Sequence, residues 1–301
     1  MKIIFLGTPD FAIPSLQSIY HSNHDLIAVV TVPDKEQGRG RKLSASPVKK
    51  FAVEKNIPLY QPEKLKGNLD FSEQMKDLKP DLFVVVAFKI LPKEIFEIPR
   101  YGSFNLHASL LPKYRGAAPI QWALINGETE TGLTTFKLAE KVDTGNIYIQ
   151  KRVQIYPDDN FGTLHNRLSE LGAEVVMDTI SLIESGKYEL IPQDDSLATP
   201  APKITKEICQ INWNKSALEI HNLVRGLSPE PAAFFNFNGK IIKIFKTEVV
   251  RHLQLKPFEF FQTKKELFIG CREDSLKILE IQLEGKKRMG IEEFLRGFSF
   301  I

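Results

Sequence analysis

The sequence has few cysteines and no long apolar run. Only two of its 301 residues are cysteines, Cys209 and Cys271, and they lack the spacing of metal ligands. Two thiols are too few for a disulfide framework, so we expect reduced thiols, no metal and a cytoplasmic location. No segment approaches the roughly 18 uninterrupted apolar residues of a membrane-spanning helix. We therefore expect neither a disulfide scaffold nor a membrane protein.

The first apolar stretch also lacks two familiar signals. It is broken at Gly7 and Pro9, so we interpret it as a strand rather than a signal peptide. The turn that follows lacks the G-x-G-x-x-G pattern of dinucleotide-binding folds, which argues against such a site.

The excess of positive over negative charge is small as well. The formal net charge is +3, from 40 Lys and Arg against 37 Asp and Glu. From Thr205 onward, 16 of the basic residues stand against 12 of the acidic ones, which leaves 24 against 25 before it. The C-terminal third therefore carries +4 and the rest −1. This asymmetry indicates an anionic partner.

Apolar patterning predicts an α/β domain over residues 1–189. Two short aliphatic runs, Lys2–Leu6 and Leu26–Val32, enclose a helical pattern, which indicates a βαβ unit. The run Asp81–Ala87 is apolar on both alternating faces, as in a parallel sheet covered on both sides. A long helical pattern follows over Asn160–Ser185.

A smaller β domain is predicted after a proline-rich linker. Residues 190–204 are typical of a stiff, extended connection. Residues 205–301 begin with a short amphipathic helix ended by Gly226 and continue with four strand-like runs. The dipeptide Asn238-Gly239 between the first two runs is a strong hairpin signal. These runs suggest a small barrel.

The most informative stretch is Phe104–Pro119, which reads F-N-L-H-A-S-L-L-P-K-Y-R-G-A-A-P. Its beginning is strand-like, and alternate side chains of a strand share a face, so Asn105, His107 and Ser109 would point the same way. Pro112 then ends the strand. Polar side chains are thus predicted at the carboxyl end of a strand, which is where open α/β sheets bind ligands.

A second element is the turn Val142–Gly145 between two strand-like runs. Its Asp143 carboxylate could reach His107, orient it and favour its protonated form. Each residue alone has an ordinary explanation, such as a core histidine, a turn or a strand-end cap. Their occurrence together beside the S-L-L-P-K-Y-R-G run predicts a catalytic trio of Asn105, His107 and Asp143.

The N-x-H, S-L-L-P-K-Y-R-G-A-A-P and D-T-G elements resemble those of the folate-dependent formyltransferases, and the resemblance covers essentially the whole chain. It implies a Rossmann-like α/β domain followed by an OB-like β-barrel, a fold that often binds nucleic acid. It also implies 10-formyltetrahydrofolate as co-substrate. Part of the folate wall would be formed by Ser109, Leu110, Leu111 and Pro112.

Within this family, the chain is similar to the members that formylate the α-amine of initiator methionyl-tRNA for translation initiation. The G-A-A-P-I-Q sequence after Arg115 and the basic loop Gly38–Lys42 favour that acceptor. The alternative is an amino-sugar nucleotide, since its formyltransferases can share the S-L-L-P-K-Y-R-G run. A non-catalytic nucleic-acid-binding module would not need N-x-H and D-T-G together. We expect a monomer.

The basic loop is expected to approach the acceptor end of the tRNA. Arg39 matches the arginine of the family's loop, and Arg41 and Lys42 add positive charge. Alternating glycines and arginines cannot bury a core, so a solvated loop is the structural alternative.

A second basic segment, Lys286, Lys287 and Arg288, follows a predicted strand of the C-terminal domain. We predict that it holds the tRNA backbone. The alternative is a solvated charge run, because acidic residues, including Glu284, lie nearby.

Overall fold

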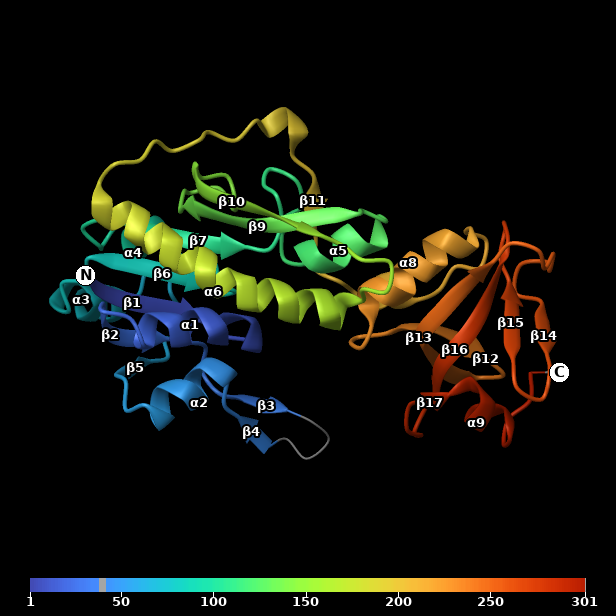
Figure 1. Cartoon of the computed structure of the whole chain (residues 1–301). Helices are drawn as coiled ribbons and strands as arrows, with labels where there is room; N and C mark the ends of the chain where they lie inside the picture. The colour runs from blue at the N-terminus through green and yellow to red at the C-terminus, as the bar shows by residue number, and fades with distance from the viewer. Residues whose placement is uncertain (38–41, 301) are drawn as a thin grey trace. The chain divides into compact units, whose positions relative to one another are not determined.

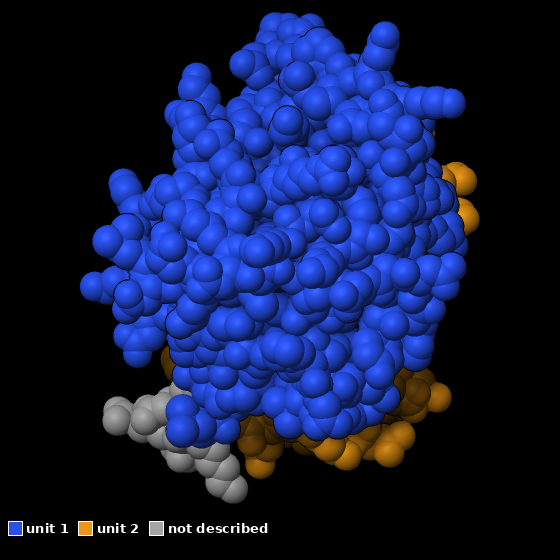
Figure 2. Space-filling view, turned by 90° about the vertical axis from the view of Figure 1, so that its left-hand side faces the viewer, with its two compact units in different colours: residues 1–116, 131–153, 165–200 blue, residues 117–130, 154–164, 201–301 orange. Residues whose placement is uncertain are grey.

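The computed structural model describes residues 1–37 and 42–300, and the chain forms two compact units, coloured separately in Figure 2. The first unit contains residues Met1–Gly116, Thr131–Val153 and His165–Pro200. The second contains residues Ala117–Glu130, Gln154–Leu164 and Ala201–Ile301. Two segments within the predicted first domain, 117–130 and 154–164, thus group with the C-terminal residues. The domain limits at 189 and 205 stay a prediction.

The first unit is built on a seven-stranded sheet in the order β10-β9-β7-β6-β1-β2-β5 (Figure 1). Its strands are β1 (Lys2–Gly7), β2 (Asp25–Val30), β5 (Leu59–Tyr60), β6 (Leu82–Val86), β7 (Ser103–His107), β9 (Glu130–Lys137) and β10 (Ile147–Gln154). Strands β5, β2, β1, β6 and β7 are parallel to one another, whereas β9 is antiparallel to β7. The predicted α/β class is confirmed.

Helices cover both faces of this sheet. They are α1 (Ile13–Tyr20), α2 (Pro47–Glu54), α3 (Leu69–Asp77), α4 (Lys93–Phe96) and α6 (Phe161–Ser185), with a short 3-10 turn η1 (Asp10–Ala12) and the strands β3 (Lys35–Gln37) and β4 (Lys42–Ser44). Ser46 caps α2 by accepting a hydrogen bond from the Lys49 amide. None of the helices in the described part of the chain is long and apolar enough to cross a membrane.

The packing of α6 shows on which face of the sheet the predicted site lies. A Cβ at Gly172 of α6 would lie 2.7 Å from the Leu106 side chain, and the Thr135 and Thr179 hydroxyls are 2.7 Å apart. Leu106 therefore faces α6. Because strand residues alternate, Asn105 and His107 face the opposite side, the side covered by α3 and α4.

The register of the central strands places their carboxyl ends at one edge. Gly7 of β1 lies beside Val86 of β6, and Val86 lies beside Leu106 of β7. His107 is the last residue of β7. It stands where loops from β1, β6 and β7 leave the sheet, which is the edge at which open α/β sheets bind ligands.

The second unit holds an antiparallel sheet in the order β12-β13-β16-β15-β14, with β17 paired to β16. Its strands are β12 (Ala233–Phe237), β13 (Lys240–Val250), β14 (Phe260–Gln262), β15 (Leu267–Gly270), β16 (Ser275–Leu283) and β17 (Met289–Gly290). The rings of Phe237 and Phe260, from the two ends of this order, are 5.2 Å apart, so the sheet curls on itself. Asn238 and Gly239 form the predicted hairpin, both with positive φ.

The helices of this unit are α5 (Pro119–Ile125), α7 (Lys206–Cys209), α8 (Ala217–Leu227) and α9 (Ile291–Leu295). A capping box of Ser216 and Glu219 begins α8. The prediction that Gly226 ends this helix is wrong, because Gly226 lies within it. A Cβ there would meet the Ile125 side chain at 2.7 Å, so the glycine serves close packing of α8 on α5.

His221 of α8 is expected to make the stability of this unit depend on pH. Burial lowers its pKa, the nearby Arg225 charge lowers it further, and a hydrogen bond with the Thr247 backbone acts in the opposite direction. The folded protein thus disfavours the charged ring. The contribution of the neutral His221 ring to stability is complete above the pKa of the unfolded state, about 6.5, and is lost as the pH falls below that value.

The measurement is urea unfolding of the wild type and His221→Gln between pH 7.5 and 5.5. The wild type should lose stability more steeply, by at most about 1.4 kcal/mol per pH unit. Parallel curves would contradict this assignment.

Candidate active site

His107 is held by a backbone carbonyl. Its Nε2 lies 2.8 Å from the Tyr114 carbonyl oxygen, and the residue is only 6% exposed. A carbonyl oxygen can only accept, so Nε2 must carry the proton of this hydrogen bond. This hydrogen bond fixes the ring, and Nδ1 is the ring nitrogen that remains available for another partner.

Asp143 faces that remaining nitrogen. Its Oδ2 lies 3.8 Å from His107 Nδ1, an ion-pair distance but too long for a hydrogen bond. The same oxygen accepts a 2.8 Å hydrogen bond from the Gly116 amide. The structure therefore brings together the two side chains that the sequence analysis paired, both largely buried.

Asn105 completes the group from the middle of β7. It is half-buried, two residues before His107 on the same face of the strand. Within residues 1–37 and 42–300, no hydrogen bond engages its side-chain amide. This amide is therefore free to donate to a substrate.

The segment Ser109–Pro112 follows β7 as a tightly held loop. Ser109 lies beyond the strand, so alternation does not set its direction, and its hydroxyl donates to the Lys113 carbonyl at 2.6 Å. The Thr134 hydroxyl donates to the Ser109 carbonyl at 2.6 Å and accepts from the Leu111 amide at 3.2 Å. Leu110 and Pro112 are partly exposed. A folate wall formed by this segment stays a prediction.

Four supporting residues were not found from the sequence. Thr134 holds the loop after β7 together with Gln150, whose Nε2 donates to the Leu111 carbonyl at 2.6 Å. Gln193 and Thr199 contact the segments around Asp143 and His107. All four act on backbone atoms, and a backbone partner leaves no motif in a single sequence.

The predicted tRNA contacts have different surroundings. Arg39 and Arg41 lie outside the described residues, and Lys42 begins β4. Of the C-terminal group, Lys286, Lys287 and Arg288 are exposed.

Two of these three basic residues lie next to carboxylates. Lys287 lies 3.5 Å from Glu293, whereas Arg288 donates to Glu280 at 2.6 Å and stacks 4.4 Å from the centre of the Phe245 ring. Their role in tRNA binding stays a prediction.

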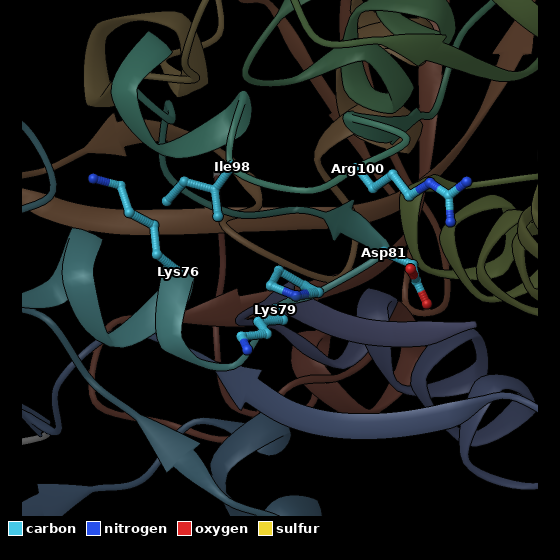
Figure 3. Close-up of a pocket in the computed structure, with 6 residues that line it drawn as sticks. Lys76, Lys79, Asp81, Ile98 and Arg100 are labelled. Carbon is cyan, nitrogen blue, oxygen red and sulfur yellow. The ribbon is translucent and has the colours of Figure 1, made fainter.

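A separate shallow pocket lies at the amino end of β6, away from His107 (Figure 3). It is lined by Lys76, Lys79, Pro80, Asp81, Ile98 and Arg100. The three basic side chains point in different directions rather than toward one point. None of the predicted catalytic residues lines it.

Comparison with known proteins decides the family. Residues 1–180 match the family model described as formyl transferase, and residues 203–299 match the formyl transferase C-terminal domain. The chain belongs to the formyl transferase family. A relative in this family, the methionyl-tRNA formyltransferase of Caldanaerobacter subterraneus subsp. tengcongensis, is 49% identical over 99% of this chain and 97% of its own. The predicted family is confirmed.

Solved structures of formyltransferases share the fold. An N-formyltransferase from Helicobacter canadensis, in complex with folinic acid and dTDP-3-aminofucose, has a TM-score of 0.70 at 22% identity, over 96% of this chain and 100% of that one. Methionyl-tRNA formyltransferase from Clostridium thermocellum has a TM-score of 0.59 at 19% identity, over 84% and 95% of the two chains. At such identities the likeness concerns the fold alone.

Proposed function

We propose that this protein transfers the formyl group of 10-formyltetrahydrofolate to the α-amine of methionyl-tRNA, giving N-formylmethionyl-tRNA for translation initiation. The observation that carries the proposal is 49% identity, over nearly the whole chain, to a methionyl-tRNA formyltransferase. The N-formyltransferase solved in complex with dTDP-3-aminofucose is 22% identical. A monomer in the cytoplasm stays a prediction.

The side chains around His107 suit formyl transfer. The amine attacks the formyl carbon, and negative charge develops on the formyl oxygen. Preorganised donors stabilise such charge. The free amide of Asn105 is one such donor, and a protonated Nδ1 of His107 is the other, since Nε2 is occupied by the Tyr114 carbonyl.

Asp143 supports this role of His107. Its carboxylate faces Nδ1 at 3.8 Å and is placed to orient the ring. It could also accept the proton that leaves the attacking nitrogen, through a water molecule, and pass it toward the leaving amine. Acid–base assistance of this kind is worth about 10²- to 10⁴-fold in rate.

The deciding experiment supplies 10-formyltetrahydrofolate with either methionyl-tRNA or a 4-amino-sugar nucleotide. We expect formylation of the tRNA and none of the sugar. Formylation of the sugar nucleotide alone would overturn the proposal and favour the alternative acceptor. Formylation of neither would refute both.

The exposed lysines of the second unit are proposed to contact the tRNA backbone. Each phosphate contact releases counterions, so binding weakens steeply with salt. Changing Lys286 and Lys287 together to Ala should lower tRNA affinity and flatten the log–log salt slope by roughly one unit per lost contact. Catalysis at saturating tRNA should change little. Arg288 is left intact, because its removal would also disturb its packing on Phe245.

The control for this experiment is a Lys64→Ala, Lys66→Ala double variant, which removes the same charge from two exposed lysines of the first unit. An equal change of slope in both double variants would show a general charge effect and contradict a contact at Lys286 and Lys287.

A further inference from the structure

The chain between Ile191 and Thr199, here called the strap, lies along the segments that carry the candidate catalytic residues. At its beginning, Ile191 exchanges two backbone hydrogen bonds with Ile147 of β10, at 2.8 and 3.0 Å. At its end, the Thr199 carbonyl accepts from the Arg115 amide at 2.9 Å. The strap is therefore fixed on both sides of the His107–Asp143 pair.

Gln193 of the strap forms hydrogen bonds with the turn that contains Asp143. Its Nε2 donates to the carbonyl oxygens of Asp143, at 2.9 Å, and Gly145, at 2.7 Å. A side-chain amide has two N–H donors, and both are used here. One side chain thus ties together the residues before and after Thr144.

Arg115 fixes the orientation of this amide. Its Nε and Nη2 donate to Gln193 Oε1 at 3.1 and 2.7 Å, and Nη2 also donates to Asp195 at 2.7 Å. A guanidinium can only donate and a carbonyl can only accept, so the amide has one orientation that satisfies both neighbours. Gln193 is held rigidly, and so is the turn.

Thr199 fixes the backbone next to His107 in a similar way. Its hydroxyl accepts from the Tyr114 amide at 2.9 Å. Tyr114 has a positive φ of 61°, and its carbonyl is the oxygen that fixes His107 Nε2. Thr199 therefore holds both peptide groups of Tyr114: its hydroxyl binds the one before this residue, and its backbone carbonyl, through the Arg115 amide, binds the one whose oxygen orients the imidazole.

We propose that Gln193 and Thr199 are positioning residues for formyl transfer. Gln193 keeps the Asp143 carboxylate in front of His107 Nδ1, and Thr199 keeps the Tyr114 carbonyl on Nε2. This inference rests on the proposed function, because it gives these residues their effect through Asp143 and His107. Neither residue needs to touch a substrate.

The main test is Gln193→Ala, alone and combined with Asp143→Asn. If Gln193 acts through the carboxylate, the single variant should lower kcat about 10- to 100-fold, since small misplacements of catalytic groups have effects of this size. KM for 10-formyltetrahydrofolate and for methionyl-tRNA should stay within about threefold. In the Asp143→Asn background, the further change should lower kcat less than about threefold.

A nearby control separates positioning from general damage to the strap. Asp194 is exposed, and in the described part of the chain its side chain hydrogen-bonds only to Ser196, so Asp194→Ala should leave kcat near that of the wild type. Should Gln193→Ala fail to fold, Thr199 carries the test. Thr199→Val should lower kcat, and Thr199→Ser, which keeps the hydroxyl, should restore it.

The outcomes distinguish this inference from the proposed function. A normal kcat in folded Gln193→Ala would overturn the inference, as would an equal loss of kcat in the Asp143→Asn background. If Thr199 carries the test, a normal kcat in Thr199→Val would overturn it. If instead Asp143→Asn itself kept the wild-type rate, the proposed role of Asp143 would fail, whatever Gln193 does.

Discussion

Removing His107, Asn105 or the Asp143 carboxylate should abolish most formyl transfer while leaving the fold intact. His107→Ala and Asn105→Asp should each lower kcat at least about 10²- to 10³-fold, the usual cost of losing one donor to a developing oxyanion. Asp143→Asn should lower kcat about 10²- to 10⁴-fold, because it removes the group that assists proton transfer. Asn105→Asp is the sharpest of these changes, because it replaces the amide donor with an acceptor of the same shape. Single-turnover formylation of methionyl-tRNA measures the effect.

The matched control is His24→Ala. His24 is half-buried and precedes β2 at the opposite edge of the sheet, where its Nδ1 lies 3.4 Å from the N-terminal amine. We expect near-normal turnover in this variant. A folded His107→Ala protein with normal turnover would refute the proposed site.

Gly145→Ala should damage both stability and activity. A Cβ at this position would lie 1.6 Å from the Lys137 carbonyl oxygen and 2.9 Å from its carbon, so strand β9 or the D-T-G turn must move. Overpacking of this kind costs about 1 to 3 kcal/mol in the free energy of unfolding. Because Gln193 also binds the Gly145 carbonyl, Asp143 should shift, and we expect kcat to fall at least about 100-fold.

The control variant is Gly297→Ala, where an added Cβ would meet no atom within 4 Å. Its free energy of unfolding should change by less than about 0.5 kcal/mol. Urea unfolding and kcat measured on both variants provide the test. A Gly145→Ala protein with the stability and kcat of the wild type would contradict the expected steric conflict.

The elements with local signals could be predicted from the sequence. The buried strand β6, the long helix α6 and the Asn238-Gly239 hairpin agree with their predicted places within a few residues. Each has a pattern that depends on its own side chains. Gly226 shows the limit, since it was interpreted as a helix end, whereas its reason is the close approach of a helix distant in sequence.

The candidate site was only partly predictable for the same reason. Asn105, His107 and Asp143 belong to motifs, so a family resemblance was enough to group them. Gln193 lies in a stretch whose prolines indicate a linker, and nothing in its neighbours shows that its amide binds a turn 50 residues earlier. Contacts between a side chain and a distant backbone need the fold to be known.

The antiparallel direction of β9 constrains the length of the segment that joins the end of this strand to Asp143. Since Lys137 lies beside Phe104 and Thr134 beside His107, β9 ends near the beginning of β7. The segment after it must run back along the direction of β7 to bring Asp143 to His107. One residue spans at most about 3.6 Å of extended chain. Shortening the segment between Leu138 and Asp143 would therefore reduce the distance over which it can carry the carboxylate back toward the imidazole, so the length of this loop is tied to the geometry of the site.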